Sequence, residues 1–425
     1  MQRSRLDGQI YDVIVCGAGC AGSAAAWGAA KAGARTLLLE RLGFAGGTPV
    51  AGMIHTLDAV VSCADSNQVV VGGFATSLLD ELRDLGGLGT SDNPGDVVSF
   101  HPEYMKVAID RLLTHAGAVT LYRAPVVGVL MQDSRVVGVE AALMDGRAHF
   151  SASCVVDATG DAEIAHYSGA RWQQSEELQA ITYHFRLGNV ARGWDWKMLE
   201  DAAQKAMHGS GMRYGGPWVI RINEYEISIN STRVIGNPLD PEERTRLEQN
   251  AREDMLIIYN VLRQKVPALA DSYILAGATD LHVRESRKIE GVYTLTEEDI
   301  WSRRSFEDKI ALGAWPIDIH PTNGFVGVHP HKESPPDPYE IPYRCLVPRS
   351  VDGLLVAGRP ISTTHRAHGS TRVPGTSLAT GHAAGVAAAI AARGGIAPRK
   401  VDTSILQQSL REQGAILSPD AAVAR

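Results

Sequence analysis

The first forty residues most constrain what this chain can fold into. Residues 11–16 (Tyr-Asp-Val-Ile-Val-Cys) form a short apolar run rich in β-branched side chains, as in a buried parallel strand. A glycine-rich run, residues 17–22 (Gly-Ala-Gly-Cys-Ala-Gly), follows at once. An alanine-rich helical stretch then leads into residues 35–40, a second strand that ends in an acid. This order, within roughly 30 residues, predicts a β-loop-α-β unit that binds a dinucleotide.

Each glycine of this motif, and the acid that follows it, has a physical role. Gly17 permits the tight turn after the strand, Gly19 lets the backbone approach a pyrophosphate, and Gly22 lets the helix pack closely on the sheet. The helix start offers free N–H groups to phosphate. Glu40 is placed to accept ribose hydroxyls and would repel a 2′-phosphate, which disfavours NADP. The alternative is a glycine-rich turn without a nucleotide. The expected cofactor contacts in this unit are Gly17, Gly19, Cys20, Ala21, Gly22 and Glu40.

A second glycine-rich segment follows the acid and helps to choose between NAD and FAD. It runs from Arg41 to Thr48 and includes Gly46 and Gly47. These glycines can form a nest of N–H groups that faces a pyrophosphate or a flavin. Simple NAD dehydrogenases rarely need a second loop here, whereas FAD is longer and lies extended. We therefore expect FAD, with Arg41, Gly46, Gly47 and Thr48 among its contacts.

Later segments strengthen this interpretation through a family resemblance. The runs GAGCAG, LLLE and FAGGT resemble the glutathione-reductase-type FAD fold, and residues 154–161 (Cys-Val-Val-Asp-Ala-Thr-Gly-Asp) resemble its second FAD motif. Residues 283–289 (Val-Arg-Glu-Ser-Arg-Lys-Ile) resemble a signature of the FAD-dependent oxidoreductase family. Residues 343–359 and 368–385 continue the resemblance, which covers most of the chain and is weakest over 171–280.

The resemblance implies further contacts with FAD. It implies that backbone near Val126 meets the adenine and that the second motif binds the cofactor. The last core strand and the start of the final long helix should approach the flavin, where a helix N-terminus suits negative charge on the reduced ring. The further contacts expected are Val126, Ala158, Thr159, Gly160, Asp161, Gly358, Arg359, Gly381, His382 and Ala383.

Two positions depart from the family pattern. Relatives often carry Pro-Thr-Cys before the last helix, whereas this chain has Gly-Thr-Ser at 375–377, so a cysteine function there is absent. Hydroxylase relatives end the late strand with Gly-Asp, whereas this chain has Gly358-Arg359. The role of that Asp toward the ribityl chain must then pass to other groups, which makes hydroxylase chemistry less favoured.

The pattern along the chain predicts an α/β protein: a Rossmann-like FAD-binding domain, with a parallel sheet plus a β-meander, and an inserted α+β substrate or cap domain. Residues 1–170 plus 345–425 would form the first domain and 171–344 the second, with 60–100 contributing to the substrate side. Helices are expected at 72–85, 102–115, 241–264 and 377–392, and strands at 118–122, 126–131, 136–142, 148–150, 154–157, 180–187, 218–231 and 352–359.

Candidate substrate-side residues each have two interpretations. His55, His365 and His368 are candidate catalytic bases, since histidine titrates near neutral pH, or structural residues. Arg284 and Arg287 would form an anion clamp on a helical face, or salt bridges to the acids at 297–299. The tryptophans of the insertion either line an apolar pocket or pack in its core; they are Trp194, Trp196, Trp218, Trp301 and Trp315.

Composition excludes several other classes of protein. A net charge of −7 disfavours nucleic-acid binding. The five cysteines form no CxxC pair and no metal-ligand spacing with histidines, so no metal site is expected and a reducing, cytoplasmic location fits best. The uncharged stretch 13–30 is rich in Gly and Ala rather than Leu, so a membrane segment is not expected.

These features together predict a flavin-dependent oxidoreductase acting on a small organic molecule. A dehydrogenase or oxidase that transfers hydride to FAD N5 is favoured, since the protein binds and tunes the flavin that performs the redox step. The alternatives are a reductase that saturates a double bond and a non-catalytic dinucleotide-binding regulator. No second GxGxxG follows, which argues against a dedicated NAD(P)H domain. The electron acceptor would be oxygen, a quinone or a redox partner, and a homo-oligomer is possible.

Overall fold

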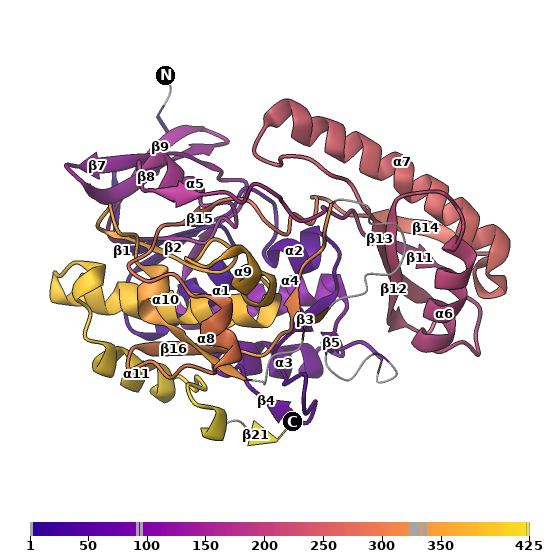
Figure 1. Ribbon diagram of the computed structural model, residues 1–425. Helices are drawn as coiled ribbons and strands as arrows, with labels where there is room; N and C mark the ends of the chain where they lie inside the picture. The colour runs from indigo at the N-terminus through magenta and orange to yellow at the C-terminus, as the bar shows by residue number, and fades with distance from the viewer. Residues whose placement is uncertain are drawn as a thin grey trace.

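A parallel sheet carries the N-terminal motif at its centre (Figure 1). The computed structural model describes residues 3–90, 93, 97–322, 332–333, 338–421 and 423–424. The parallel strands lie in the order β6 (Val119–Leu121), β2 (Thr36–Leu39), β1 (Gln9–Cys16), β9 (Gly146–Asp157) and β20 (Leu354–Val356). Because the carboxyl ends of parallel strands share one edge, the loops that follow β1, β2, β9 and β20 meet there.

The β-meander grows out of the same sheet through β9. The first half of β9 pairs antiparallel with β8 (Arg135–Leu143), which in turn pairs with β7 (Val126–Gln132). The second half of β9 turns parallel to β1, with Cys154 opposite Val13. The separate strands expected at 148–150 and 154–157 are therefore one strand. Its side chains alternate in burial along the meander and become fully buried from Cys154, where both faces are covered.

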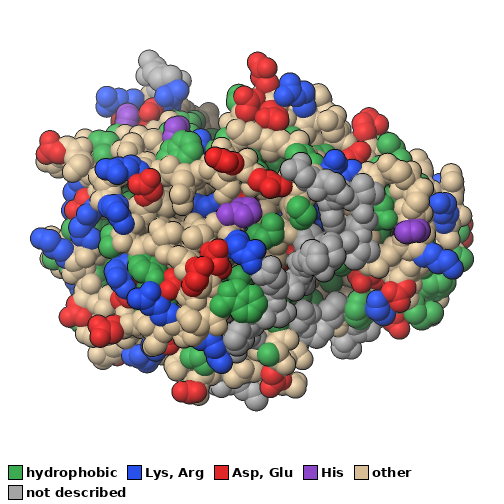
Figure 2. Space-filling view, in the orientation of Figure 1, with side chains coloured by type: hydrophobic (Ala, Val, Ile, Leu, Met, Phe, Trp, Pro, Cys, Tyr) green, Lys and Arg blue, Asp and Glu red, His purple; other side chains and the backbone are tan. Residues whose placement is uncertain are grey.

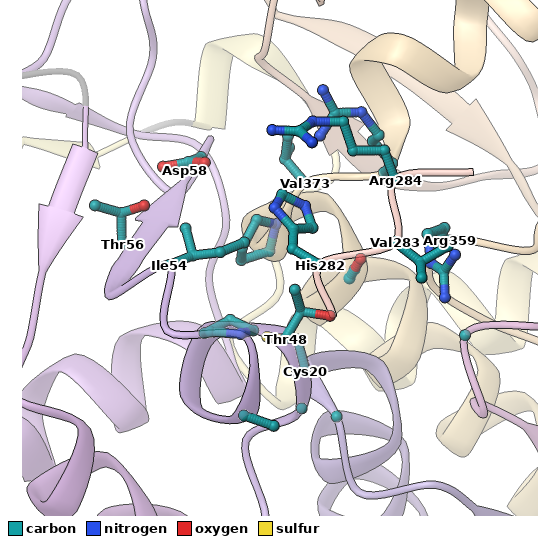
Figure 3. A pocket seen from close by; sticks show the side chains of 18 of the residues that line it. Cys20, Thr48, Ile54, Thr56, Asp58, His282, Val283, Arg284, Arg359 and Val373 are labelled. Atoms are coloured by element: carbon teal, nitrogen blue, oxygen red, sulfur yellow. The ribbon is translucent and has the colours of Figure 1, made fainter. Parts of the chain in front are cut away.

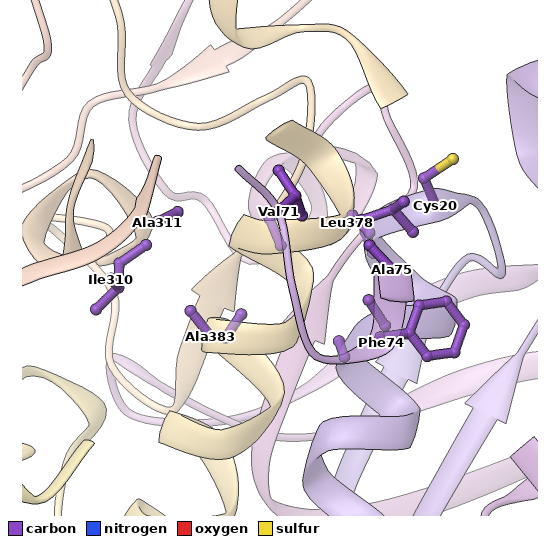
Figure 4. Close-up of a cluster of buried hydrophobic side chains, with 14 of the residues drawn as sticks. Cys20, Val71, Phe74, Ala75, Ile310, Ala311, Leu378 and Ala383 are labelled. Atoms are coloured by element: carbon purple, nitrogen blue, oxygen red, sulfur yellow. The ribbon is translucent and has the colours of Figure 1, made fainter. Parts of the chain in front are cut away.

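Two helices pack face to face against this sheet: α1 (Cys20–Lys31) and α10 (Pro374–Gly394). A Cβ at Gly381 or Gly385 would overlap the carbonyl of Ala21 or Ala25, so these glycines bring the helices together. Figure 4 shows Leu378 and Ala383 of α10 among the buried apolar side chains beside α1. The other helices of this part are α2 (Gly47–Ala51), α3 (Phe74–Asp84), α4 (Pro102–Ala116), α5 (Glu163–Tyr167), α8 (Glu297–Trp301), α9 (His365–Thr371) and α11 (Thr403–Glu412).

A second lobe lies beside this unit, at the right of Figure 1. Its antiparallel sheet is ordered β12 (Tyr214–Asn223), β13 (Glu226–Thr232), β11 (Phe185–Gly188) and β14 (Tyr273–Gly277), with α6 (Trp196–Met207) and α7 (Pro241–Lys265) packed on it. The single strand expected at 218–231 is a hairpin, because the Asn223 side chain accepts a hydrogen bond from the Tyr225 N–H and turns the chain. The helix expected at 241–264 is confirmed.

Short strand pairs and turns complete the description. The pairs are β3 (Thr56–Asp58) with β5 (Val97–Ser99), β4 (Gln68–Val69) with β21 (Val423–Ala424), β10 (Trp172–Gln173) with β15 (Lys288–Ile289), β16 (Lys309–Gly313) with β19 (Tyr339–Pro342), and β17 (Ile317–Asp318) with β18 (Lys332–Glu333). Short 3-10 turns cover Pro267–Leu269, Tyr343–Leu346, Pro398–Lys400 and Pro419–Ala421.

The architecture confirms the expected fold class, a Rossmann-like sheet with a meander and an additional α+β lobe. Along the residues that the structure describes, no helix has both the length and the apolarity needed to cross a bilayer. On the face drawn in Figure 2, basic and acidic side chains are interspersed rather than segregated.

Candidate active site

A cavity of about 640 Å³ opens at the carboxyl edge of the parallel sheet and reaches the second lobe. Its walls come from the loops after β1, β2, β9 and β20, from the start of α10, and from β12, β13 and the segment after β14. One end is formed by the expected dinucleotide motif, and the other by side chains of the second lobe. Figure 3 shows side chains from both ends around this space.

The three motif glycines have distinct positions at the first end. Gly17 has a φ of +92°, and a Cβ there would lie 2.6 Å from the carbonyl oxygen of Ala158. A Cβ at Gly22 would overlap the carbonyl oxygen of Gly17. Gly19, in contrast, lines the cavity, and its nearest neighbour for a Cβ would be Gly47 Cα at 3.7 Å. Gly17 and Gly22 therefore shape the turn, whereas Gly19 keeps the mouth of α1 open.

Glu40 is held in place at this mouth by backbone donors. Its Oε2 accepts a hydrogen bond from the Ala18 N–H at 2.6 Å, and its Oε1 accepts one from the Leu42 N–H at 2.7 Å. The side chain is buried and still lines the cavity. A carboxylate has about four acceptor positions, so two remain for sugar hydroxyls. The start of α1 carries no acidic side chain, which leaves its N–H groups and partial positive charge for phosphate.

Charged groups from both lobes meet beside the glycine motif. Arg41 and Arg244 both pair with Asp280, the second at 2.7 Å between Nη2 and Oδ1. Arg359 Nη2 lies 2.7 Å from Asp161 Oδ1. Although burial opposes it, the Arg359 charge holds the pKa of Asp161 below its usual range. At the position where hydroxylase relatives have an Asp, this chain therefore places an arginine already paired with a neighbouring carboxylate.

Three histidines form much of the other end of the cavity: His184, His282 and His320. The His184 and His282 rings lie 5.6 Å apart between centroids. Burial first, and then the charge of Arg284, hold the pKa of each of these histidines well below its usual range. They are therefore neutral at neutral pH. Within the described part of the chain, His184 Nε2 and His282 Nδ1 have no hydrogen-bond partner, and both imidazole side chains line the cavity.

The histidines expected from sequence as bases do not line this cavity, which corrects that expectation. His55 is fully buried with its ring edge against Phe100, and burial lowers its pKa to about 3. His368 is also buried, and its Nε2 lies 2.9 Å from the carbonyl oxygen of Arg284. His365 Nδ1 lies 3.1 Å from Glu285 Oε1, outside the lining residues. His365 and His368 are thus bonded to neighbouring protein groups, whereas His55 is enclosed by packing.

Gly381, His382 and Ala383 also lie away from the cavity. The final long helix starts at Pro374 rather than Ser377, so these residues fall in its second and third turns. Gly381 packs against Ala21, and His382 Nε2 lies 2.8 Å from Gln413 Oε1. The first turn instead lines the cavity with Val373, Pro374 and Ser377. A proline at the first helical position was the sequence signal for this start.

Most expected cofactor residues do line the cavity. They are Gly17, Gly19, Cys20, Ala21, Glu40, Arg41, Gly47, Thr48, Ala158, Thr159, Gly160, Asp161, Gly358 and Arg359. Gly22 and Gly46 are not among the lining residues: a Cβ at Gly22 would overlap the Gly17 carbonyl, and one at Gly46 would overlap the Val50 side chain. Val126 lies in β7 and is not a lining residue either. Among the described residues, no group of three or more His, Cys, Asp or Glu side chains could hold a metal ion.

Arg284 and Arg287 do not share a helical face. The chain forms no helix at 283–287. Arg284 lines the cavity, while Arg287 donates to the Asp161 carbonyl and covers the Trp172 ring. Neither pairs with the acids at 297–299: Arg304 bonds Asp299 instead. Of the tryptophans, three line the cavity, namely Trp196, Trp218 and Trp315. Trp194 packs in the second lobe and Trp301 is 40% exposed.

Comparison with known proteins agrees with this site. A family model described as FAD dependent oxidoreductase matches residues 12–410. This chain therefore belongs to the FAD-dependent oxidoreductase family. FAD is its cofactor, and it is an enzyme rather than a dinucleotide-binding regulator.

Solved structures resemble the fold at low sequence identity. A geranylgeranyl bacteriochlorophyll reductase-like protein from Thermoplasma acidophilum is 14% identical, with a TM-score of 0.50, over 96% of this chain and 84% of that one. The myxobacterial chondrochloren halogenase CndH is 15% identical, also with a TM-score of 0.50, over 95% of this chain and 79% of that one. No curated protein sequence matches. These likenesses concern the fold and leave the reaction open.

Proposed function

We propose that this enzyme is a dehydrogenase or oxidase that removes hydride from a small organic molecule. The observation that carries this proposal is the continuity of the cavity. It runs from the FAD mouth at Gly19 and Glu40 to a pocket lined by His184 and His282. A molecule in that pocket would share the space with the flavin end of the cofactor. When bound, FAD supplies the hydride acceptor at N5.

The residues of the chain would bind the molecule and manage its proton. Removal of hydride from a C–H bond beside an O–H or N–H also releases a proton, and the neutral imidazole of His282 or His184 can accept it. Trp218 and Trp315 line the same space and would exclude water from the reacting bond. We assign residues 171–344 to substrate binding, because His184, Trp218 and His282 all come from that segment. Thr56, Asp58 and Val97, which lie outside that segment, also line the cavity.

Anaerobic reduction of the purified FAD-bound protein tests this proposal. Small alcohols, amines, hydroxy acids and amino acids are added one class at a time while the visible flavin absorbance is followed. One class should bleach the flavin, and admitting oxygen or a quinone should restore the colour and identify the acceptor. Bleaching by NAD(P)H alone, with colour restored by an alkene, would instead indicate the double-bond reductase.

A histidine variant tests the assigned proton acceptor. His282→Asn keeps a hydrogen-bonding side chain of similar size without a titrating group. It should slow flavin reduction by roughly 10²–10⁴-fold and leave the spectrum of bound FAD unchanged. His208→Asn is the matched control, because His208 is exposed at the end of α6 in the same lobe. An unaltered reduction rate in His282→Asn would move the proton-accepting role to His184.

A further inference from the structure

Three arginines gather near the histidine end of the cavity: Arg233 and Arg284, which are buried, and Arg372, which is partly buried. Arg233 and Arg284 are each 1% exposed, and Arg284 and Arg372 line the cavity. They come from the end of β13, the segment after β14 and the residues just before α10. Three separate parts of the chain therefore bring guanidinium groups to one place, which is costly in free energy unless negative charge balances them.

The partners of Arg284 are neutral. Its Nη1 donates to the Ala180 carbonyl at 2.7 Å and to Thr182 Oγ1 at 2.6 Å. Its Nε has no partner, and in the portion of the chain that the structure describes no carboxylate lies within ion-pair distance of it. Figure 3 shows Arg284 among the side chains around the cavity. A buried guanidinium whose printed partners are all neutral thus lines an open space.

Asp318, the carboxylate whose charge acts on Arg284, is already shared by other groups. Asp318 Oδ2 accepts from Arg372 Nη2 at 3.1 Å and lies 3.0 Å from His320 Nε2. Burial first, and then the charges of Arg233 and Arg372, depress the pKa of Arg284, while Asp318 opposes this. The surrounding histidines are neutral and add acceptors or donors without charge. Among the described residues, Arg284 thus feels the positive charges of Arg233 and Arg372 against the single carboxylate of Asp318, while Asp58 and Glu285 act on Arg372.

We propose that this end of the cavity binds the carboxylate of a monoanionic substrate, with Arg284 as its principal partner. The proposal deepens the proposed function and rests on it. A planar guanidinium suits a carboxylate, because its two N–H groups can donate in parallel to both oxygens. Trp218 and Trp315 line the neighbouring wall and match an apolar or aromatic body. The substrate class is thus a small organic acid whose oxidisable carbon lies between its carboxylate and the flavin.

This chemistry connects the anion site to the histidines. The charge of Arg284 is the second cause, after burial, that keeps the pKa of His184 and of His282 low. A bound carboxylate would offset that charge and make each imidazole a better proton acceptor once substrate is present. Substrate binding and base strength would then be coupled through one arginine.

Binding of benzoate to the FAD-bound enzyme tests the proposal without turnover. Calorimetry and the flavin difference spectrum are recorded with benzoate and with benzamide, which has the same ring and no charge. Benzoate should bind at least 10-fold more tightly than benzamide. Arg284→Met should weaken benzoate by roughly 10- to 100-fold, as loss of a charged hydrogen bond predicts, and leave benzamide unchanged. Arg284→Lys keeps the positive charge and loses the two parallel N–H donors of the guanidinium. Its affinity for benzoate should lie between those of the wild type and Arg284→Met, and it tests the proposal if the methionine variant does not fold.

Arg246→Met is the matched control, because Arg246 is exposed on α7 of the same lobe. Equal affinity for benzoate and benzamide, or an Arg284→Lys variant that binds benzoate as tightly as the wild type, would overturn the proposal. Chloride that binds at this site while benzoate does not would show an inorganic anion site and also overturn it. Loss of FAD from the Arg284 variants would reassign the arginine to the cofactor. Failure of the proposed function would be distinguishable: benzoate would still bind to the wild type, but no class of reductant would bleach its flavin.

Discussion

Replacement of Gly19 by leucine should abolish FAD binding and leave the fold intact. Gly19 has φ −70° and ψ −170°, a conformation that any residue adopts. A Cβ there would meet Gly47 Cα at an ordinary 3.7 Å, and the rest of the leucine would fill the mouth of α1 where phosphate must approach. The apo variant should therefore differ from the apo wild type by less than about 1 kcal/mol. Gly22→Ala, in contrast, should fail to fold, because its Cβ would overlap a backbone carbonyl.

The size of the effect follows from linkage. FAD at 100 times its Kd stabilises the wild type by about 2.7 kcal/mol. An unfolding entropy of about 2.1 cal/mol/K per residue gives about 0.9 kcal/mol/K for 425 residues, so FAD should raise the wild-type Tm by about 3 °C. The Tm of Gly19→Leu should not respond to FAD. Gly394→Leu is the control and should respond as the wild type does, because Gly394 is exposed and a Cβ there would make only ordinary contacts with Ile396. A yellow Gly19→Leu protein with one FAD per chain would refute this reasoning.

Three further changes test other parts of the structure. Gly381→Ala should destabilise the protein by about 1–3 kcal/mol, because its Cβ pushes α10 away from Ala21; an unchanged urea midpoint would contradict the close packing. Glu40→Gln should weaken FAD by at least 10-fold, since its amide N–H₂ would face a backbone N–H; equilibrium dialysis measures this, and wild-type affinity would count against the sugar contact. Burial lowers the pKa of His382 to about 4, below the unfolded value of about 6.5, so the unfolded chain binds more protons in between and stability falls as pH falls. The free energy of unfolding, measured in urea, should fall between pH 7 and pH 5 by about 2 kcal/mol less in His382→Gln than in the wild type. An equal fall in both proteins would exclude His382 as its source.

The cofactor half of the site could be predicted because its signals are local. Three of its residues lie within one short unit of the chain. Gly17 makes the turn after the strand, Gly19 leaves room for phosphate, and Glu40 stands at the end of the next strand. The strand expected at 154–157 is also present, as the end of β9. Where a boundary was missed, as at the start of α10, the error was a few residues, yet it moved His382 from the flavin side to the helix interface.

The substrate half could not be predicted in this way. His184, His282 and His320 lie far apart in the sequence and carry no motif, whereas His55, His365 and His368 stand near recognisable segments and were favoured for that reason. Burial and hydrogen bonding then removed those three from the cavity. No local pattern distinguishes a histidine that faces a cavity from one that faces a core.

The sequence by itself determined the nucleotide-binding unit and the family, because steric limits on backbone and the charge of a helix end act over a few consecutive residues. Tertiary structure alone decided which histidines and arginines share one space, since the pairing of β11 with β14 and the packing of the second lobe bring Arg284 and His184 together from about 100 positions apart. Their low pKa values and unbalanced charge exist only after that assembly removes water from them.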